Sequence, residues 1–210
     1  ETQGASMRHF QFALVFFVSM CLPGLASAAL ISAGFQVNLN DSDPGLVVDS
    51  ADIAANPFSF TLNEGGSTTF NLFKIWTDES AVNGDDQIEK HISVDFNFTS
   101  PALVSGSANG NTVGKKWIGG LFQGGTLSWG PPLQLVFGAL GDGLLEVSLS
   151  DTEFNKGLFG INDGEKYGGK VKATITLVRE ASQVPEPGTL GLLAAGLLGL
   201  GLRARRRLAS

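Results

Sequence analysis

The sequence predicts an all-β body, an antiparallel β-sandwich of jelly-roll or immunoglobulin-like type, between an N-terminal signal peptide and a short C-terminal transmembrane helix. Three observations favour this fold class. Apolar and polar residues alternate in several short segments, which is the period-2 pattern of half-buried strands. Clusters of Gly, Asn and Asp separate these segments, as turns do. No stretch between residues 29 and 183 has a sustained helical period.

The predicted strands follow in chain order. Segments 58–62, 91–98, 145–149 and 170–179 alternate, and the third of them sets Glu146 on the outward face. The apolar faces of 91–98 and 170–179 are expected to point inward; they consist of Ile92, Val94, Phe96 and Phe98, and of Val171, Ala173, Ile175 and Leu177. Segment 70–76 is apolar on both faces and is expected in the middle of a sheet. Turns are expected at 63–66, 83–86, 109–111, 141–143 and 162–164.

Residues 1–28 have the pattern of a secretory signal peptide preceded by a few residues without a role in it. Met7 opens a short positive region, residues 10–22 are apolar, and Ala26 and Ala28 form a cleavage box that places the mature start at Ala29. Export by the general pathway is expected. Cys21, the one cysteine, falls in the removed segment, so the mature chain must fold without disulfides.

The expected mature body, residues 29–183, is long enough for one domain with its own core. It carries 18 Asp and Glu against 9 Lys and Arg, a formal net charge of −9. Nucleic-acid binders carry a basic face, so this balance argues against a nucleic-acid partner. An acidic surface instead suits solubility or the binding of divalent cations.

Residues 184–210 form a tripartite tail. The motif Val184, Pro185, Glu186 and Pro187 is expected to be extended, because each proline disfavours helix in the residue before it. An apolar stretch follows at 188–202, which as a helix would be about 22 Å long, a short membrane span. The stop is basic and favours the cytoplasmic side; it contains Arg203, Arg205, Arg206 and Arg207.

This tail resembles the PEP-CTERM sorting signal of Gram-negative bacteria, with all three parts in order. The resemblance covers about residues 184–207 and implies an exosortase as partner. It implies transient anchoring in the inner membrane through the C-terminal helix, then processing near Pro185 to Pro187. It also implies a final place at the cell surface or in the extracellular matrix, linked to exopolysaccharide and biofilm. A plain single-pass anchor is the alternative.

Catalytic chemistry is sparse in the body, and the protein is expected not to be an enzyme. His91, its one histidine, lies on the outward face of a predicted strand with no convergent partner in the sequence pattern. Asp95 and Glu146 are the carboxylates expected on strands. A glycosidase needs two carboxylates, about 5 Å apart for a retaining or about 6.5–9.5 Å for an inverting mechanism, a separation that sequence does not give.

Calcium is the one cofactor for which the sequence offers candidates. Oxygen-bearing side chains cluster at 38–43 and 83–86, and the expected ligands are Asp41, Asp43, Asp85 and Asp86. Calcium binds six to eight oxygens and is often held by loops. The alternative is turn chemistry, because Asn, Asp and Gly occupy tight turns for backbone reasons.

Two tryptophans are candidates for stacking on sugar rings. Trp117 and Trp129 lie near Gly-rich segments, and core packing is the alternative for both. The sequence therefore predicts a secreted, exosortase-sorted matrix protein with a structural or adhesive role. A carbohydrate-binding module is the second hypothesis, and a glycoside hydrolase is the third.

Overall fold

The computed structural model describes residues 28–182, together with Gly196 and Leu197. The predicted signal segment before Ala28 and the predicted tail at 184–210, except for those two residues, lie outside this range. Within the part of the chain that is described, no helix is long and apolar enough to cross a membrane.

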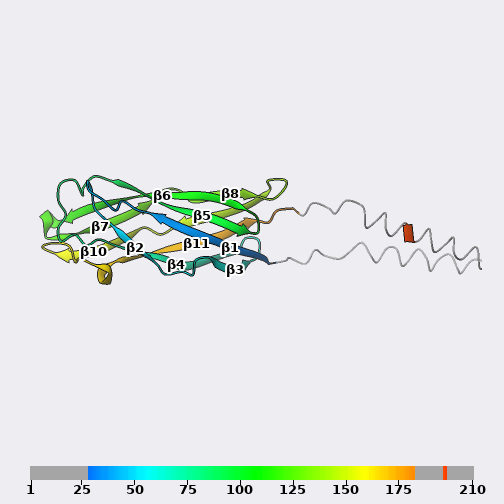
Figure 1. Cartoon of the computed structure of the whole chain (residues 1–210), viewed down its shortest axis with the longest axis horizontal. Coiled ribbons are helices and arrows are strands. Elements are labelled where there is room, and N and C mark those ends of the chain that lie inside the picture. The colour runs from blue at the N-terminus through cyan, green and yellow to red at the C-terminus, as the bar shows by residue number, and fades with distance from the viewer. Residues whose placement is uncertain (1–27, 183–195, 198–210) are drawn as a thin grey trace, which may run out of the picture.

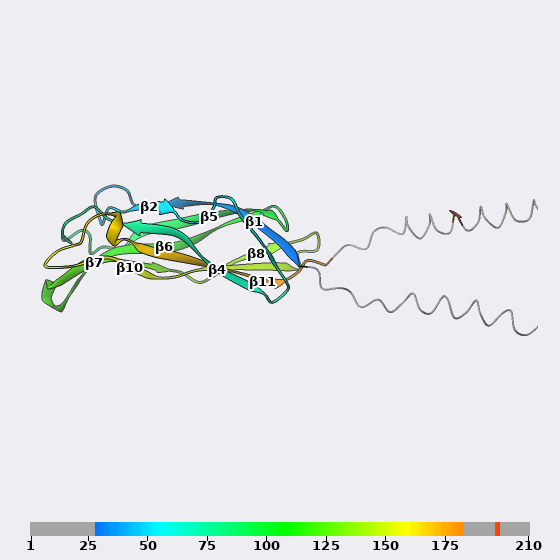
Figure 2. The same ribbon diagram turned by 90° about the horizontal axis from the view of Figure 1, so that it is seen from below.

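The body is all-β and consists of two antiparallel sheets packed face to face (Figures 1 and 2). In spatial order, the six-stranded sheet contains β10 (Thr152–Leu158), β7 (Phe122–Trp129), β6 (Val104–Trp117), β5 (Lys90–Ser100), β1 (Ala29–Asn38) and β3 (Phe58–Leu62). The five-stranded sheet contains β2 (Asp49–Asp52), β4 (Ser67–Trp76), β11 (Gly169–Arg179), β9 (Gly143–Leu149) and β8 (Leu133–Phe137). Two short 3₁₀ turns, Ile118–Gly120 and Glu165–Tyr167, complete the described elements.

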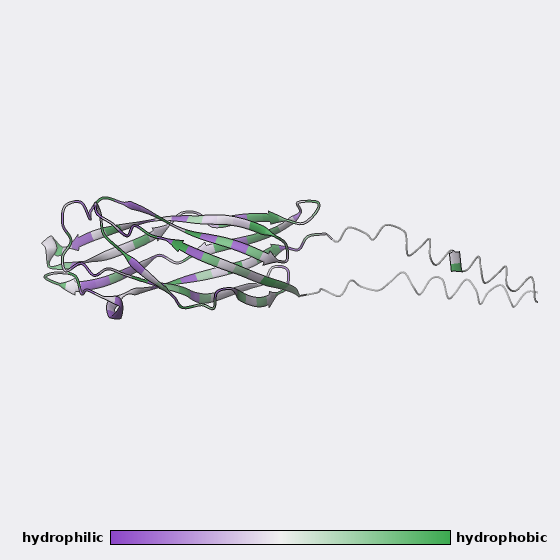
Figure 3. Cartoon of the chain, viewed as in Figure 1, coloured by the Kyte–Doolittle hydropathy of each residue, from purple (hydrophilic) through white to green (hydrophobic). Residues whose placement is uncertain are grey.

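All five predicted strands are present, as β3, β4, β5, β9 and β11. The apolar faces predicted for 91–98 and 170–179 are buried in the core between the sheets. The alternation of polar and apolar residues along the strands is visible in Figure 3. Segment 70–76 lies in β4, between β2 and β11, as expected for an inner strand. A β-bulge in β4 leaves Leu72 without a pairing partner on β11, and Leu72 and Phe73 are both buried.

The turn predicted at 109–111 is wrong, because these residues lie in the middle of β6. The inward positions of β6 hold small residues, among them Gly106, Ala108 and Gly110. A Cβ on Gly106 would lie 2.8 Å from Leu135 Cδ2 in the facing sheet. These glycines therefore leave room for side chains of the opposite sheet and do not form a turn. The other four predicted turns do connect strands.

Both ends of the described body leave from the same end of the elongated sandwich (Figure 1). Ala29 pairs with Leu62, and the Glu180 N–H donates to Glu64 Oε2 at 3.1 Å, close to the same connection between β3 and β4. The turn between β6 and β7 and the end of β10 lie at the opposite end. The first and last strands of the body, β1 and β11, thus begin and end, respectively, at the same end of the sandwich.

Candidate functional site

The outer side of the six-stranded sheet is lined by small polar residues, and we call it the polar face. Strand alternation places these side chains outward, because residues paired across antiparallel strands share a face. The polar face comprises Gln36, Asn38, His91, Ser93, Asp95, Asn97, Ser105, Ser107, Asn109, Asn111, Thr126 and Ser128. Amides and hydroxyls predominate on it.

A hydrogen-bond network holds the part of this face where β1, β5 and β6 meet. Asn38 Nδ2 donates to Asp95 Oδ2 at 2.9 Å and to Ser93 Oγ at 3.1 Å. The Ser107 hydroxyl donates to the other carboxylate oxygen of Asp95. These bonds, first that of Ser107 and then that of Asn38, hold the pKa of Asp95 below its ordinary value of 3.8. Asp95 is therefore a fixed, ionised acceptor on the face.

Three open hollows follow one another across the polar face. The first is lined by Asp95, Asn97 and Ser107, among others, where β1, β5 and β6 meet. The second lies over β5, β6 and β7 and is lined in part by Asn109 and Ser128. Ser128 also lines the third, which continues to β7 and β10. The hollows thus form a shallow polar track rather than one deep pocket.

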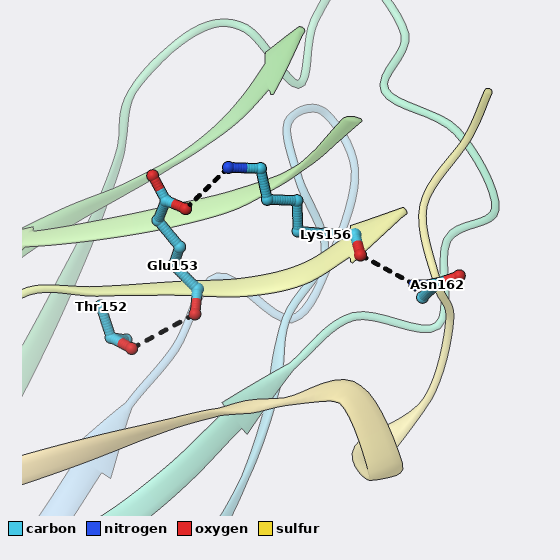
Figure 4. Close-up of polar contacts among 4 residues, drawn as sticks. All are labelled: Thr152, Glu153, Lys156 and Asn162. Carbon is cyan, nitrogen blue, oxygen red and sulfur yellow. Dashed lines mark hydrogen bonds and ion pairs between the residues drawn. The ribbon is translucent and has the colours of Figure 1, made fainter. Parts of the chain in front are cut away.

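Trp117 lies at the distal end of this track, at the end of β6. It is paired with Phe122 of β7, and its indole is partly exposed. The Nζ atom of Lys156 lies 4.6 Å from the centre of the Trp117 ring, a cation–π contact. Lys156 Nζ also lies 3.2 Å from Glu153 Oε2, and its backbone carbonyl accepts from Asn162 Nδ2 at 2.8 Å (Figure 4). The strand β10 therefore holds a cation over the tryptophan.

Trp129 faces the other way. Its pairing with Gly110 places it inward, and its ring packs edge-on against Phe73 with centroids 6.4 Å apart. A Cβ on Gly110 would lie 2.7 Å from Cε3 of the indole. This geometry is that of core packing, the alternative that the sequence left open for Trp129.

The two candidate carboxylates of a glycosidase do not face each other. Asp95 lies on the outer side of the six-stranded sheet. Glu146 pairs with Gln134 and Thr176 and lies on the outer side of the five-stranded sheet. The core of the sandwich separates them, so this pair does not form a hydrolytic site. His91 is exposed on β5, beside Asn111.

The predicted calcium ligands have unequal environments. Asp41 and Asp43 are exposed in the connection between β1 and β2. Asp85 is half-buried, and its Oδ2 accepts at 2.9 Å from the N–H of Gly45, which lies two residues after the first predicted run. Asp86 is fully buried. Over the described residues, no group of three or more His, Cys, Asp or Glu side chains is placed to hold a metal ion.

Sequence reasoning missed most of the polar face. It also missed Glu79, a half-buried carboxylate that accepts from the Val47 N–H at 2.7 Å and lies beside Asp86. The face has a signal in the sequence, because segment 105–111 alternates small polar residues with Gly and Ala. That alternation was masked by the turn-forming character of Asn and Gly. Glu79 has no comparable local signal, since it lies outside both oxygen-rich runs.

Comparison with known proteins gives one match. The family model of the PEP-CTERM protein-sorting motif matches residues 183–207. The match begins directly after Ser182, the last residue of the described body. No curated protein and no solved structure matches the chain.

Proposed function

We propose that the body of this protein is a non-catalytic matrix adhesin. The premise is that the chain carries a PEP-CTERM protein-sorting motif and is an exosortase-sorted protein of the cell surface or secreted space. The ligand in this proposal is exopolysaccharide, bound along the polar face. The role thus combines the adhesive and the carbohydrate-binding hypotheses.

The observation that carries the proposal is the polar track of three successive hollows across the six-stranded sheet, from β1 to β10. Polysaccharides present rows of hydroxyl groups, which both donate and accept hydrogen bonds. Asn side chains offer both functions, and the ionised Asp95 is an acceptor whose orientation is fixed by Ser107 and Asn38. A long shallow surface suits a chain-like ligand better than a small one, since small ligands prefer enclosed pockets.

Trp117 supports a role at the end of the track. Its ring lies on the outward side of β6, where an aromatic face is able to stack on a sugar ring. Lys156 occupies part of that environment and adds a positive charge. Glu153 pairs with this charge, so the proposal rests on the hydroxyl groups of the polysaccharide rather than on acidic groups.

The location of the track relative to the motif also supports the proposal. Ser182 is still bound to the body, because its backbone N–H donates to Asp142 Oδ2 at 3.1 Å. The segment matched by the motif follows without a spacer. Sorting would thus act at one end of the sandwich. The polar face, which lies along the six-stranded sheet, would stay free for polysaccharide.

Binding to purified exopolysaccharide of the producing bacterium tests the proposal. The exported protein would be compared with a double variant, Asn97→Ala and Asn109→Ala, and with Trp117→Ala, by affinity electrophoresis. We expect at least a tenfold loss of affinity in the double variant. The matched control is Asn71→Ala with Gln134→Ala, which removes an Asn and a Gln from the other sheet. Equal binding by all variants would refute the polar face as the binding surface.

We also propose the jelly-roll type for the sandwich. Successive strands from β1 to β5 alternate between the two sheets, which is typical of jelly rolls. Immunoglobulin-like sandwiches instead keep more hairpins within one sheet. An experimental structure of the exported protein tests this assignment.

A further inference from the structure

Asp86 is a buried carboxylate whose hydrogen bonding is incomplete. It lies in the connection between β4 and β5, at residues 77–89, and its side chain is inaccessible to solvent. Its Oδ2 accepts from the Asn83 N–H at 2.6 Å, and its carbonyl accepts from the Gly114 N–H at 2.7 Å. Oδ1 is also buried and has no hydrogen-bond partner among the described residues. Such an oxygen is costly unless something satisfies it.

A second carboxylate faces Asp86. Glu79 lies within hydrogen-bonding reach of Asp86, and its Oε1 accepts from the Val47 N–H at 2.7 Å. Burial raises the pKa of Glu79 above 4.5, the hydrogen bond from Val47 lowers it, and the charges of Asp86 and Asp43 raise it again. The carboxylates of Glu79, Asp86 and Asp43 therefore lie close enough to repel one another, between the β1–β2 and β4–β5 connections.

Within the described body, no cationic side chain forms an ion pair with Glu79 or Asp86. The ion pairs formed by the described residues join Lys74 to Glu165 and Lys156 to Glu153. Lys90 packs its aliphatic stem against Gly45, the residue that binds Asp85. It forms no ion pair with Glu79 or Asp86 within the described chain.

We propose that a calcium ion binds between the carboxylates of Glu79 and Asp86 and ties the β1–β2 connection to the β4–β5 connection. Calcium is a hard cation that takes six to eight oxygens, and it accepts carboxylate, backbone carbonyl and water ligands together. The orphaned Oδ1 of Asp86 supplies a buried ligand. Glu79 supplies the other, from a side chain already oriented by Val47.

The affinity of this site follows from its ligand count. Since the described side chains provide no group of three metal-binding residues, water and backbone oxygens must complete the coordination. Sites of this kind belong to the weak class of extracellular modules, with dissociation constants of roughly 10⁻⁴ to 10⁻³ M. Calcium at such concentrations is available outside cells, where the sorting motif directs this protein. The inference does not depend on polysaccharide binding.

Thermal unfolding of the exported protein at pH 7.5 tests the proposal. After removal of metal with a chelator, addition of 10 mM calcium chloride should raise Tm by roughly 3 to 8 °C, as mass action at such a site and a domain of this size predict. Glu79→Gln should abolish the rise, and so should Asp86→Asn. Titration calorimetry of the same samples should show one calcium site per chain, lost in Glu79→Gln.

Two controls separate this site from the ligand set expected from the sequence. Asp41→Asn removes a predicted ligand that is exposed and outside the proposed site, so its response to calcium should be unchanged. Asp49→Asn removes a charge from β2 and should also respond normally. A lost response in Asp41→Asn would overturn the assignment to Glu79 and Asp86.

Other outcomes also overturn the proposal. No rise of Tm and no heat of binding in the unmodified protein would mean that no calcium ion binds between the two carboxylates. An equal rise with 10 mM magnesium chloride would mean that the site does not select calcium. If Asp86→Asn fails to fold, Glu79→Gln, in a partly exposed position, still decides between these outcomes.

Discussion

Asn155 pairs its side-chain amide with both backbone groups of Thr77, although 78 positions separate the two residues. Oδ1 accepts from the Thr77 N–H at 3.1 Å, and Nδ2 donates to the Thr77 carbonyl at 3.2 Å. Nδ2 also donates to the carbonyls of Asn162 and Gly164. Asn155 is fully buried, with φ of 54°, at a β-bulge of β10. Its side chain therefore joins β10 to two connections, the one between β4 and β5 and the one between β10 and β11.

Removal of this amide should destabilise the body. Asn155→Ala removes the side-chain partner of the Thr77 N–H and of the Gly164 carbonyl, while the Thr77 carbonyl still accepts from the Gly164 N–H. Each buried group left without a partner costs about 1–3 kcal/mol. We expect a loss of at least about 3 kcal/mol in the free energy of unfolding, measured by urea denaturation. Asn155→Gly separates the causes, because glycine tolerates the positive φ and still lacks the amide. A loss under 1 kcal/mol in both variants would refute the role of the amide.

The sequence predicts those strands that bury large apolar side chains on one face. In β5 and β11 the alternation is unbroken, because these strands contribute Phe, Val, Ile and Leu to the core. The strand β6 fills its inward positions with Gly, Ala and Thr, so its pattern resembles that of a turn. Whether this segment forms a strand depends on the side chains that the opposite sheet packs against its small residues, as Leu135 packs against Gly106. That information is not local in the sequence.

The candidate sites show the same limit. The acidic run 83–86 marks a turn and two carboxylates, and both observations are local. The placement of Glu79 against Asp86 depends on how the β4–β5 connection folds back, which the Gly114 N–H and the Val47 N–H determine through distant backbone. Likewise, Asn155 has no sequence signal beyond its residue type. Its role arises from a bulge that pairing with β7 creates.

Glycines of the six-stranded sheet should be intolerant of a methyl group where an aromatic ring lies over them. A Cβ on Gly125 would lie 2.2 Å from Cζ of Phe154, whose ring is buried. Gly125→Ala should therefore cost about 1–3 kcal/mol or more through overpacking. The matched control is Gly84→Ala, since a Cβ on Gly84 meets nothing within 4 Å. Chemical denaturation of both variants checks this, and equal effects would contradict the packing argument.

Two exposed apolar residues at the distal end of the body have strained backbones. Ile118 has φ of 50° and Phe159 has φ of 59°, and each side chain is 76% exposed. A left-handed backbone conformation costs a non-glycine residue roughly 1–2 kcal/mol. Because these side chains are mostly exposed, burial stabilises them little. Ile118→Gly and Phe159→Gly should each raise the free energy of unfolding by about 0.5–1 kcal/mol. Val136→Gly, at an exposed site in β8, should lower it. A loss of stability in both distal variants would refute the prediction.

The hydrogen bonds to Asp95 should give the polar face a defined acid dependence. Because the folded pKa of Asp95 lies below its ordinary value of 3.8, ionisation stabilises the folded state above that pH. This stabilisation is lost as the pH falls through the lowered pKa. Ser107→Ala removes the largest cause, so the pKa of Asp95 should rise towards 3.8, and Asn38→Ala should raise it less.

Carboxyl NMR titration of the exported protein measures these shifts directly. The difference in free energy of unfolding between the unmodified protein and Ser107→Ala should be constant above about pH 5 and should shrink as the pH falls below 3.8. Asn97→Ala is the control, since Asn97 lies next to Asp95 in the first hollow and makes no hydrogen bond to it within the described body. An Asp95 pKa that does not change in Ser107→Ala would show that the hydroxyl does not orient the carboxylate, and the fixed acceptor of the polar face would lose its physical basis.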